Sequence, residues 1–272
     1  MWHGMQRHTG ANGSKMDDYE LETEPFYVNA DTFTYLFKGR SLKRNLPVVV
    51  KKHDFTLIQT KAVQVRIVQT LNAALAQAKV RHPNACDILE VQMEIERANC
   101  SIFHVLEALD TDLGHDIEDR RSTNRPYVEE ELRQMLQHTA SALAFAHDKK
   151  IAHRDVKPNN IFRTAHTYKL GDFGCFFVKQ DRSETNSTAG DSRYMSPQLR
   201  RGTPYNPFKA DVFALGASLL HMATLTSPKT LVTAERIQEE VGKQMDALPC
   251  SAVLKKNSSL GCWLTKKEPD PL

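Results

Sequence analysis

Two short stretches of the chain carry residues suited to chemistry on a phosphate group. The first, His-Arg-Asp-Val-Lys-Pro-Asn-Asn at residues 153–160, contains Asp155, Lys157 and Asn160, and the second, Asp-Phe-Gly, begins at Asp172. We expect these stretches to form loops on either side of a short hairpin, which brings two carboxylates, an amide and an ammonium group together. Such a set can orient a hydroxyl, bind metal and neutralise charge, as phosphoryl transfer from a metal-bound nucleotide requires.

Composition and charge restrict the class of protein. The chain has 272 residues, 40% of them hydrophobic, which suits one large domain or two lobes sharing a cleft. A net charge of +3 gives no argument for a nucleic-acid partner. No apolar run is long enough to span a membrane, and residues 1–15 lack the apolar core of a signal peptide, so we expect no membrane association.

The cysteines indicate the compartment. Five are scattered along the chain without any CxxC pair, which favours a reducing environment with free thiols: Cys86, Cys100, Cys175, Cys250 and Cys262. We therefore expect a cytoplasmic or nuclear protein. The oligomeric state is left open.

The first part of the chain is predicted to be rich in strands. Residues 1–24 are polar and then acidic, which is typical of a disordered tail. Strands are expected at 33–37, followed by a turn at Gly39, and at 46–52, 88–93 and 102–106. Between them, residues 56–80 have helical periodicity, and Thr56 with Gln59 could form a capping box at the start of the helix.

The second part of the chain is predicted to be mainly helical. Residues 110–126 are polar and charged and are expected to be a poorly ordered linker, whereas 129–147 form an amphipathic helix. A buried helix is expected at 210–225 and an amphipathic one at 233–248. The fold class is therefore α+β, with a sheet-rich lobe over residues 25–109 and a larger helical lobe over 110–272.

The pattern His-Arg-Asp-x-Lys-x-x-Asn followed by Asp-Phe-Gly resembles the eukaryotic protein kinases, from about residue 26 to 270. The resemblance implies a bilobal fold that binds ATP and Mg²⁺ and transfers the γ-phosphoryl group to a serine or threonine of a protein substrate. It implies that Asp155 accepts the proton of the substrate hydroxyl and that Lys157 meets the transferred phosphate. Asn160 and Asp172 would hold the metal ions.

The resemblance also implies contacts with ATP. Lys51, at the end of Val-Val-Val-Lys, matches the lysine that grips the α- and β-phosphates. Glu107 and Leu109 lie where the hinge binds adenine through backbone groups. Asp112 matches a carboxylate that often meets the ribose, and the alternative for Asp112 is a solvated loop acid.

Regulation is implied by Arg154, because an arginine beside the catalytic aspartate usually means control by a phosphate bound to the activation segment. Ser187 and Thr188 are the best candidate acceptors, and the alternative is an unmodified loop rich in serine and threonine. Gly-Asp-Ser-Arg-Tyr at 190–194 resembles the Wee/Myt inhibitory kinases, which have an aspartate where most serine/threonine kinases have threonine. That subfamily would extend the acceptor to tyrosine, although its members usually lack the arginine at 154.

Several positions depart from the kinase pattern. The places of the phosphate-covering glycines are held by Asn29, Asp31 and Thr34, and no glutamate for Lys51 occurs between residues 55 and 89, where Ala73 takes the expected place. Residues 196–198 read Ser-Pro-Gln in place of Ala-Pro-Glu, and the second lobe looks shortened at its C-terminal end. These departures support an alternative function, a degraded kinase (pseudokinase) that acts as a scaffold or allosteric binding module.

Overall fold

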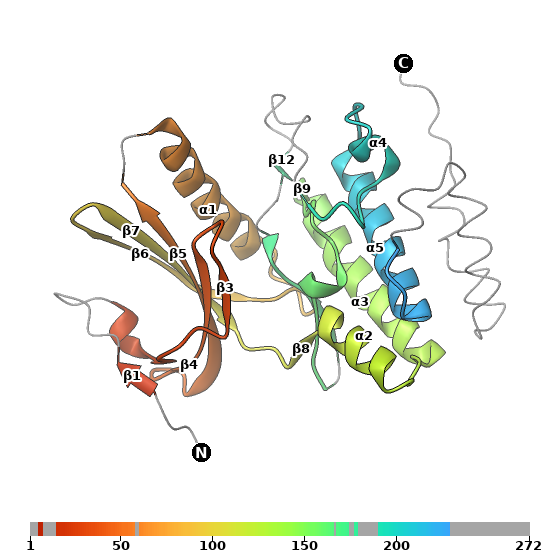
Figure 1. Cartoon of the computed structure of the whole chain (residues 1–272), viewed down its shortest axis with the longest axis horizontal. Coiled ribbons are helices and arrows are strands. Elements are labelled where there is room, and N and C mark those ends of the chain that lie inside the picture. The colour runs from red at the N-terminus through yellow and green to blue at the C-terminus, as the bar shows by residue number, and fades with distance from the viewer. Residues whose placement is uncertain are drawn as a thin grey trace. The chain divides into compact units, whose positions relative to one another are not determined.

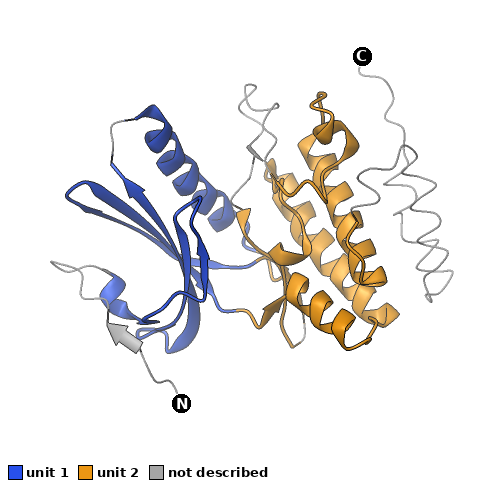
Figure 2. Cartoon of the chain, viewed as in Figure 1, with its two compact units in different colours: residues 1–81, 86–108 blue, residues 82–85, 109–272 orange. Residues whose placement is uncertain are grey.

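The computed structural model describes residues 5–7, 15–57, 60–165, 167–173, 177–178 and 190–228. The chain divides into two compact units, coloured separately in Figure 2. Unit 1 contains residues 1–81 and 86–108, and unit 2 contains residues 82–85 and 109–272. The lobes expected from the sequence meet one residue from this division and differ from it at 82–85, a short segment that belongs to unit 2.

Unit 1 is built on an antiparallel sheet in which the order of the main path is β1-β2-β4-β5-β7-β6, with β3 paired to β4. Its strands are β1 (Met5–Arg7), β2 (Tyr19–Glu22), β3 (Tyr27–Asn29), β4 (Thr34–Ser41), β5 (Leu46–Thr56), β6 (Ile88–Glu96) and β7 (Asn99–Glu107). The four strands expected from the sequence are present, and each extends further than the apolar run that predicts it. The added length is mostly polar but includes the buried Phe55 and Cys100, and its residues pair with a neighbouring strand.

One long helix, α1 (Lys61–Lys79), packs on this sheet, as Figure 1 shows. The predicted start at Thr56 is wrong, because Thr56 still belongs to β5 and the side chain of Thr60 caps the helix by accepting from the amide of Val63. Val63, Ile67 and Leu71 of this helix pack against a buried cluster of the sheet. The buried positions include small residues such as Ala73 and Ala74, whereas Leu75 is 59% exposed.

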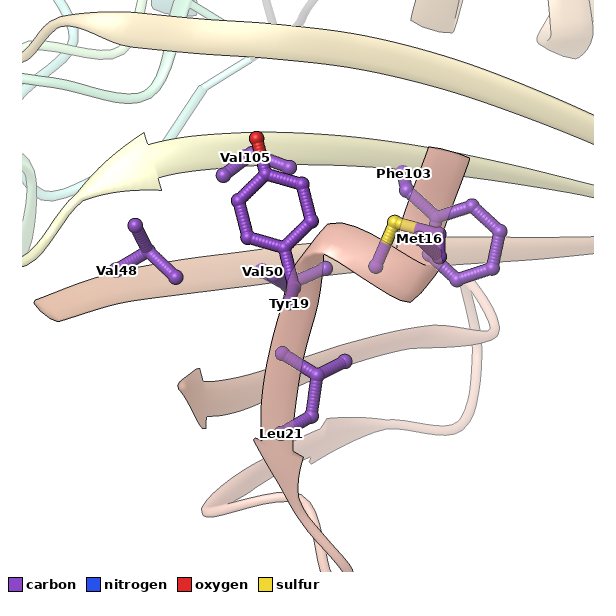
Figure 3. Packing of buried hydrophobic residues seen from close by; sticks show 7 residues of the cluster. All are labelled: Met16, Tyr19, Leu21, Val48, Val50, Phe103 and Val105. Carbon is purple, nitrogen blue, oxygen red and sulfur yellow. The ribbon is translucent and has the colours of Figure 1, made fainter. Parts of the chain in front are cut away.

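Residues 15–22 are ordered, although the sequence predicts a disordered tail over 1–24. They form a short 3-10 helix, η1 (Lys15–Asp18), followed by β2. Figure 3 shows three of their side chains packed on the sheet, in a buried cluster made of Met16, Tyr19, Leu21, Val48, Val50, Phe103 and Val105. The apolar residues are few, but alternate ones point to one face and the hydroxyl of Tyr19 donates to Glu90 at 2.6 Å. Burial of that face orders the segment.

Gly39 lies inside β4 and not in the expected turn, which the structure places at residues 42–45. A Cβ atom at Gly39 would lie 2.5 Å from Cδ2 of Leu21 and 2.7 Å from the carbonyl oxygen of Glu20. Glycine at this position therefore lets β2 approach β4.

Unit 2 contains the helices α2 (Leu113–Ser122), α3 (Glu129–Asp148), α4 (Pro197–Arg200) and α5 (Pro207–Thr224). Between α3 and α4 lie β9 (Ile151–Ala152), η2 (Pro158–Asn160), β10 (Ile161–Arg163), β11 (Tyr168–Leu170) and β12 (Phe177–Val178), and β8 (Thr111–Asp112) precedes α2. The expected helices at 129–147 and 210–225 are confirmed as α3 and α5, which lie side by side in Figure 1. The helix expected at 233–248 lies outside the described residues. Among the described residues, no helix is both long and apolar enough to cross a membrane.

The prediction of a poorly ordered linker over residues 110–126 is wrong, because most of this segment is the helix α2. Its apolar content is low, but Leu113 and Ile117 are buried one turn apart, and the side chain of Asp112 caps the first turn. Arg120 adds an ion pair to Glu131 at the start of α3, with 2.5 Å between Nη2 and Oε1. Capping and tertiary contacts therefore produce a helix that hydrophobic periodicity does not indicate.

Candidate active site

The carboxylate of Asp155 is held by donors on both of its oxygens. Its Oδ1 accepts from the backbone amide of Asp191 at 3.0 Å. Its Oδ2 accepts from Nδ2 of Asn160 at 3.0 Å and lies 2.8 Å from Nζ of Lys157. Because the side chain keeps 13% of its surface exposed, it remains open to an approaching group while its orientation is fixed. The three residues predicted for catalysis therefore lie together.

Lys157 stays protonated in this setting. Burial favours the neutral form, but the nearby carboxylate of Asp155 outweighs it, with Asp191 and Asp172 contributing further, so the pKa of Lys157 is raised above its usual range. A permanent positive charge therefore lies beside the candidate base.

The backbone of this loop is fixed by Asp211, near the start of α5, whose side chain is 1% exposed. Its two oxygens accept from the amides of His153 and Arg154 at 2.8 and 2.7 Å, and Nε2 of His147 lies 2.9 Å away. Arg154 adopts a left-handed φ of 68°, which an ordinary side chain occupies only when its surroundings enforce it. The buried carboxylate supplies that enforcement.

A second set of bonds joins this loop to the Asp-Phe-Gly segment across the hairpin of β10 and β11, whose presence confirms the expected arrangement. The amide of Gly171 donates to the carbonyl of Asn160 at 2.9 Å, and Nε2 of His153 donates to the carbonyl of Gly171 at 2.9 Å. Since Nε2 then carries the proton, Nδ1 of His153 accepts from the amide of Asp155 at 3.3 Å. The ring of His153 also packs on Phe173, with 4.6 Å between ring centroids.

Asp172 follows this junction with a left-handed φ of 59°. The preceding Gly171 is bonded to Asn160 and His153, so the backbone places Asp172 beside the loop of Asp155. The charge of Asp172 contributes a small part of the raised pKa of Lys157. That Asp172 shares a metal site with Asn160 stays a prediction.

Asp112 is neither a free loop acid nor distant from the catalytic loop. Its Oδ1 caps α2 by accepting from the amide of His115 at 3.1 Å, and the same oxygen accepts from Nδ2 of Asn159 at 3.2 Å. The carboxylate therefore links α2 to the residue before Asn160. Its contact with a ribose stays a prediction.

The other residues predicted to bind ATP belong to both units. Glu107 ends β7 in unit 1, where its amide donates to the carbonyl of Asp87 at 3.1 Å and its Oε1 accepts from the amide of Asp87 at 2.8 Å. Leu109 is the first residue of unit 2 after the chain leaves unit 1 at Ala108. Lys51 lies in the middle of β5, opposite Leu36 in β4 and His104 in β7.

The helix over unit 1 offers Lys51 no carboxylate, since α1 contains no acidic residue. The polar side chains that neighbour Lys51 on its face of the sheet include two histidines and Thr34. His104 is directly opposite Lys51, and its ring centroid is 5.1 Å from that of His53. Nδ1 of His53 in turn lies 3.0 Å from the hydroxyl of Thr34.

The loop that would cover the phosphates is closed by side chains where glycines were expected. Oδ1 of Asn29 accepts from the amide of Thr32 at 3.1 Å, and the hydroxyl of Thr32 donates to that of Thr34 at 3.0 Å. The carbonyl of Thr32 also accepts from Arg66 of α1 at 3.0 Å. This loop is therefore tied to α1.

The predicted regulatory residues are only partly described. Arg154 is 9% exposed and lines a small cavity with Asp155 and Asp191, whereas Ser187 and Thr188 lie outside the described residues. Arg193 and His147 contact site residues, and neither is predicted from the sequence. Arg193 could have been suspected from its spacing of two residues from Asp191, but His147 reaches Asp211 only through the packing of α3 on α5.

The profile of the protein kinase domain family matches residues 32–263. The chain belongs to this family. Among similar curated proteins, serine/threonine-protein kinase Nek5 of Mus musculus is 33% identical over 218 residues, covering 78% of this chain and 32% of its own length. CBL-interacting serine/threonine-protein kinase 15 of Arabidopsis thaliana is 25% identical over 221 residues, covering 80% of this chain and 50% of its own length. This kinase chain thus spans half or less of the length of these relatives.

The comparisons do not single out a kinase subfamily. A Wee1-like protein kinase of Oryza sativa is 37% identical, but over 124 residues, which cover 46% of this chain and 22% of that protein. Since Nek and CBL-interacting kinases match over longer stretches, the family is shown and the Wee/Myt resemblance is not specifically supported.

Proposed function

We propose that the protein is an ATP-dependent protein kinase that transfers the γ-phosphoryl group of ATP to a serine or threonine hydroxyl of a protein substrate. The observation that carries the proposal is the orientation of the Asp155 carboxylate by Asn160, Lys157 and the amide of Asp191, which leaves the carboxylate partly exposed. In the transfer, the hydroxyl oxygen bonds to the γ-phosphorus, the bond to the bridging oxygen breaks, and ADP leaves. Asp155 takes the hydroxyl proton, and Lys157 meets the negative charge of the transferred group.

The residues present fit Mg²⁺. The amide nitrogen of Asn160 is turned toward Asp155, where it donates to the backbone oxygen at 2.8 Å, so its oxygen is the end available to a cation. With the carboxylate of Asp172 this gives two hard oxygen donors. Both are ligand types that Mg²⁺ prefers, and phosphate oxygens and water would complete its coordination. Mg²⁺ would neutralise charge on the phosphates.

The finer assignments are also proposals. Lys51 would bind the α- and β-phosphates, Glu107 and Leu109 the adenine through backbone groups, and Asp112 the ribose. The aspartate at 191 supports the Wee/Myt resemblance, in which tyrosine would be a further acceptor. The cysteine pattern supports a cytoplasmic or nuclear location.

A second candidate function is a pseudokinase that serves as a scaffold or allosteric module. It is favoured by the side-chain bonds that close the loop at Asn29 and by the absence of acidic residues from α1. Both features weaken the expected grip on ATP without touching the cluster around Asp155.

Transfer of labelled phosphate from ATP with Mg²⁺ to a generic protein substrate tests the proposal. Asp155→Asn should lower the rate by about 10²–10⁴, the range for loss of a general base. Asp148→Asn, at the exposed end of α3, is the matched control and should leave the rate unchanged. Equal rates for the wild type and Asp155→Asn would reject the enzyme.

Nucleotide binding separates the two functions further. A binder at 100 times its Kd gains about 2.7 kcal/mol of stability, which a thermal shift detects. The absence of a shift at millimolar ATP with Mg²⁺ would favour the pseudokinase.

A further inference from the structure

Asp191 lies against the catalytic loop because the residue before it is a glycine. Gly190 has a φ of 111°, and a Cβ atom there would lie 2.6 Å from the carbonyl oxygen of Arg154. Only glycine permits both the conformation and the close approach. The chain consequently passes close enough for the amide of Asp191 to donate to Oδ1 of Asp155 at 3.0 Å.

The side chain of Asp191 is bound by Arg193. Its Oδ1 accepts from the amide and from Nε of Arg193, both at 3.0 Å, and its Oδ2 accepts from Nη2 at 2.6 Å. The amide of Tyr194 donates to the carbonyl of Asp191 at 3.0 Å, which closes a tight turn. The orientation of the Asp191 amide is therefore determined by a short, multiply bonded turn.

Both members of the pair are charged. Burial favours a neutral Asp191, but the side-chain and backbone hydrogen bonds from Arg193 outweigh it and hold the pKa of Asp191 below its usual range. The same bonds raise the pKa of Arg193. Asp191 is thus a carboxylate that Arg193 neutralises.

This neutralisation matters because Lys157 feels both carboxylates. Its ammonium group is paired with Asp155 at 2.8 Å, and Asp191 is a further source of attraction. Without Arg193, Asp191 would be an uncompensated charge near Lys157 and would compete with Asp155 for it.

We propose that Asp191 and Arg193 are positioning residues that orient the carboxylate of Asp155, and that Arg193 keeps Lys157 committed to Asp155 by neutralising Asp191. The proposal rests on the proposed kinase activity and deepens it. It predicts an asymmetry in kcat: removing Arg193 alone is more harmful than removing both charges. A merely structural ion pair would show such an asymmetry in folding stability, but not in the kcat of the folded protein.

Steady-state kinetics on the full chain tests this asymmetry. Arg193→Gln should lower kcat by about 10–100-fold, the range for a catalytic group displaced by a fraction of an ångström to 1 Å, with KM for ATP within about twofold. Arg193→Lys should have an intermediate kcat, because lysine keeps the positive charge but cannot bond to both carboxylate oxygens as the guanidinium group does. Adding Asp191→Asn to Arg193→Gln should recover part of the lost kcat, because the competing charge is gone although the bonds of the turn are not restored.

A double variant no faster than Arg193→Gln would overturn the proposal, as would an Arg193→Gln kcat within about twofold of the wild type. Hydrogen exchange of the Asp191 amide adds a readout that needs no turnover. Exchange should be faster in Arg193→Gln than in the wild type. Unchanged protection would overturn the positioning role of Arg193 even if the wild type proved inactive. A wild type no more active than Asp155→Asn would reject the proposed kinase, and this result is distinct from unchanged protection of the Asp191 amide.

Discussion

His221, in the last turns of α5, should make the stability of the protein depend on pH. Its Nδ1 lies 2.8 Å from the hydroxyl of Tyr194, a residue that is 3% exposed. Burial, with smaller contributions from the positive charges of Arg193 and Arg121, lowers the pKa of His221 to about 4, although Glu118 opposes the change. The imidazole is therefore neutral in the fold and accepts a hydrogen bond from Tyr194.

The size of the effect follows from the two pKa values. The folded value of about 4 lies below the ordinary value of 6.5, so the two differ by roughly 2.5 units. At about 1.36 kcal/mol per unit this corresponds to about 3 kcal/mol. Above pH 6.5 both states are neutral and the stability is complete. Between pH 6.5 and about 4 the unfolded chain binds a proton that the folded chain does not, so stability falls as the pH falls.

Urea unfolding at several pH values between 7.5 and 4.5 measures this loss in the wild type and in His221→Asn. The asparagine oxygen can still accept from Tyr194, but the side chain does not titrate. The wild type should therefore lose about 2.5 kcal/mol more than the variant over this window, slightly less than the full difference because the window ends above the folded pKa. Comparing the two curves removes the contribution of the other titrating groups. Parallel curves would refute the argument that burial keeps His221 neutral.

The remaining predictions concern Asp211, which fixes the backbone of the loop at residues 153–154, and the N-terminal strand β2. Asp211→Asn should destabilise the chain by about 2–4 kcal/mol, because one amide oxygen cannot serve the donors that the two carboxylate oxygens serve, whereas the exposed control Asp148→Asn should be neutral; equal melting temperatures for the two would contradict it. Gly39→Ala should cost about 1–3 kcal/mol because its Cβ collides with Leu21, and the cost should disappear in a chain that lacks residues 1–22. A cost that persists in the shortened chain would place the strain elsewhere.

The catalytic loops could be predicted from the sequence because local order determines them. Asp155, Lys157 and Asn160 lie within one loop, and a short hairpin separates them from Asp172, so spacing alone brings them together. The interpretation of Asp112 was incomplete for the opposite reason. Its partner Asn159 is distant in sequence, and the contact depends on how α2 packs on the catalytic loop.

The helices show where hydrophobic periodicity fails. In α1 the apolar positions Val65, Val68 and Leu75 help to predict the helix, yet they are 44%, 54% and 59% exposed. The side that packs on the sheet carries other apolar residues, Val63, Ile67 and Leu71. Hydrophobic periodicity therefore finds this helix but does not choose between its two apolar faces. The prediction of a disordered N-terminal segment is wrong for a similar reason. Its short strand is ordered by burial against residues far along the chain.

The cluster around Asp155 contains residues that the fold needs and residues that only chemistry needs. His153, Asn160 and Asp211 bond backbone groups across two loops, so a folded pseudokinase would need them as well. Lys157 is different, because its charge is held in a half-buried place where burial opposes it, and a neutral side chain would fill that place at a lower cost. Since Lys157 is paired with the very oxygen of Asp155 that Asn160 also orients, the pair is easier to explain by phosphoryl transfer than by stability. The pair of Lys157 and Asp155 is therefore stronger support for an active kinase than the sequence pattern of the loop.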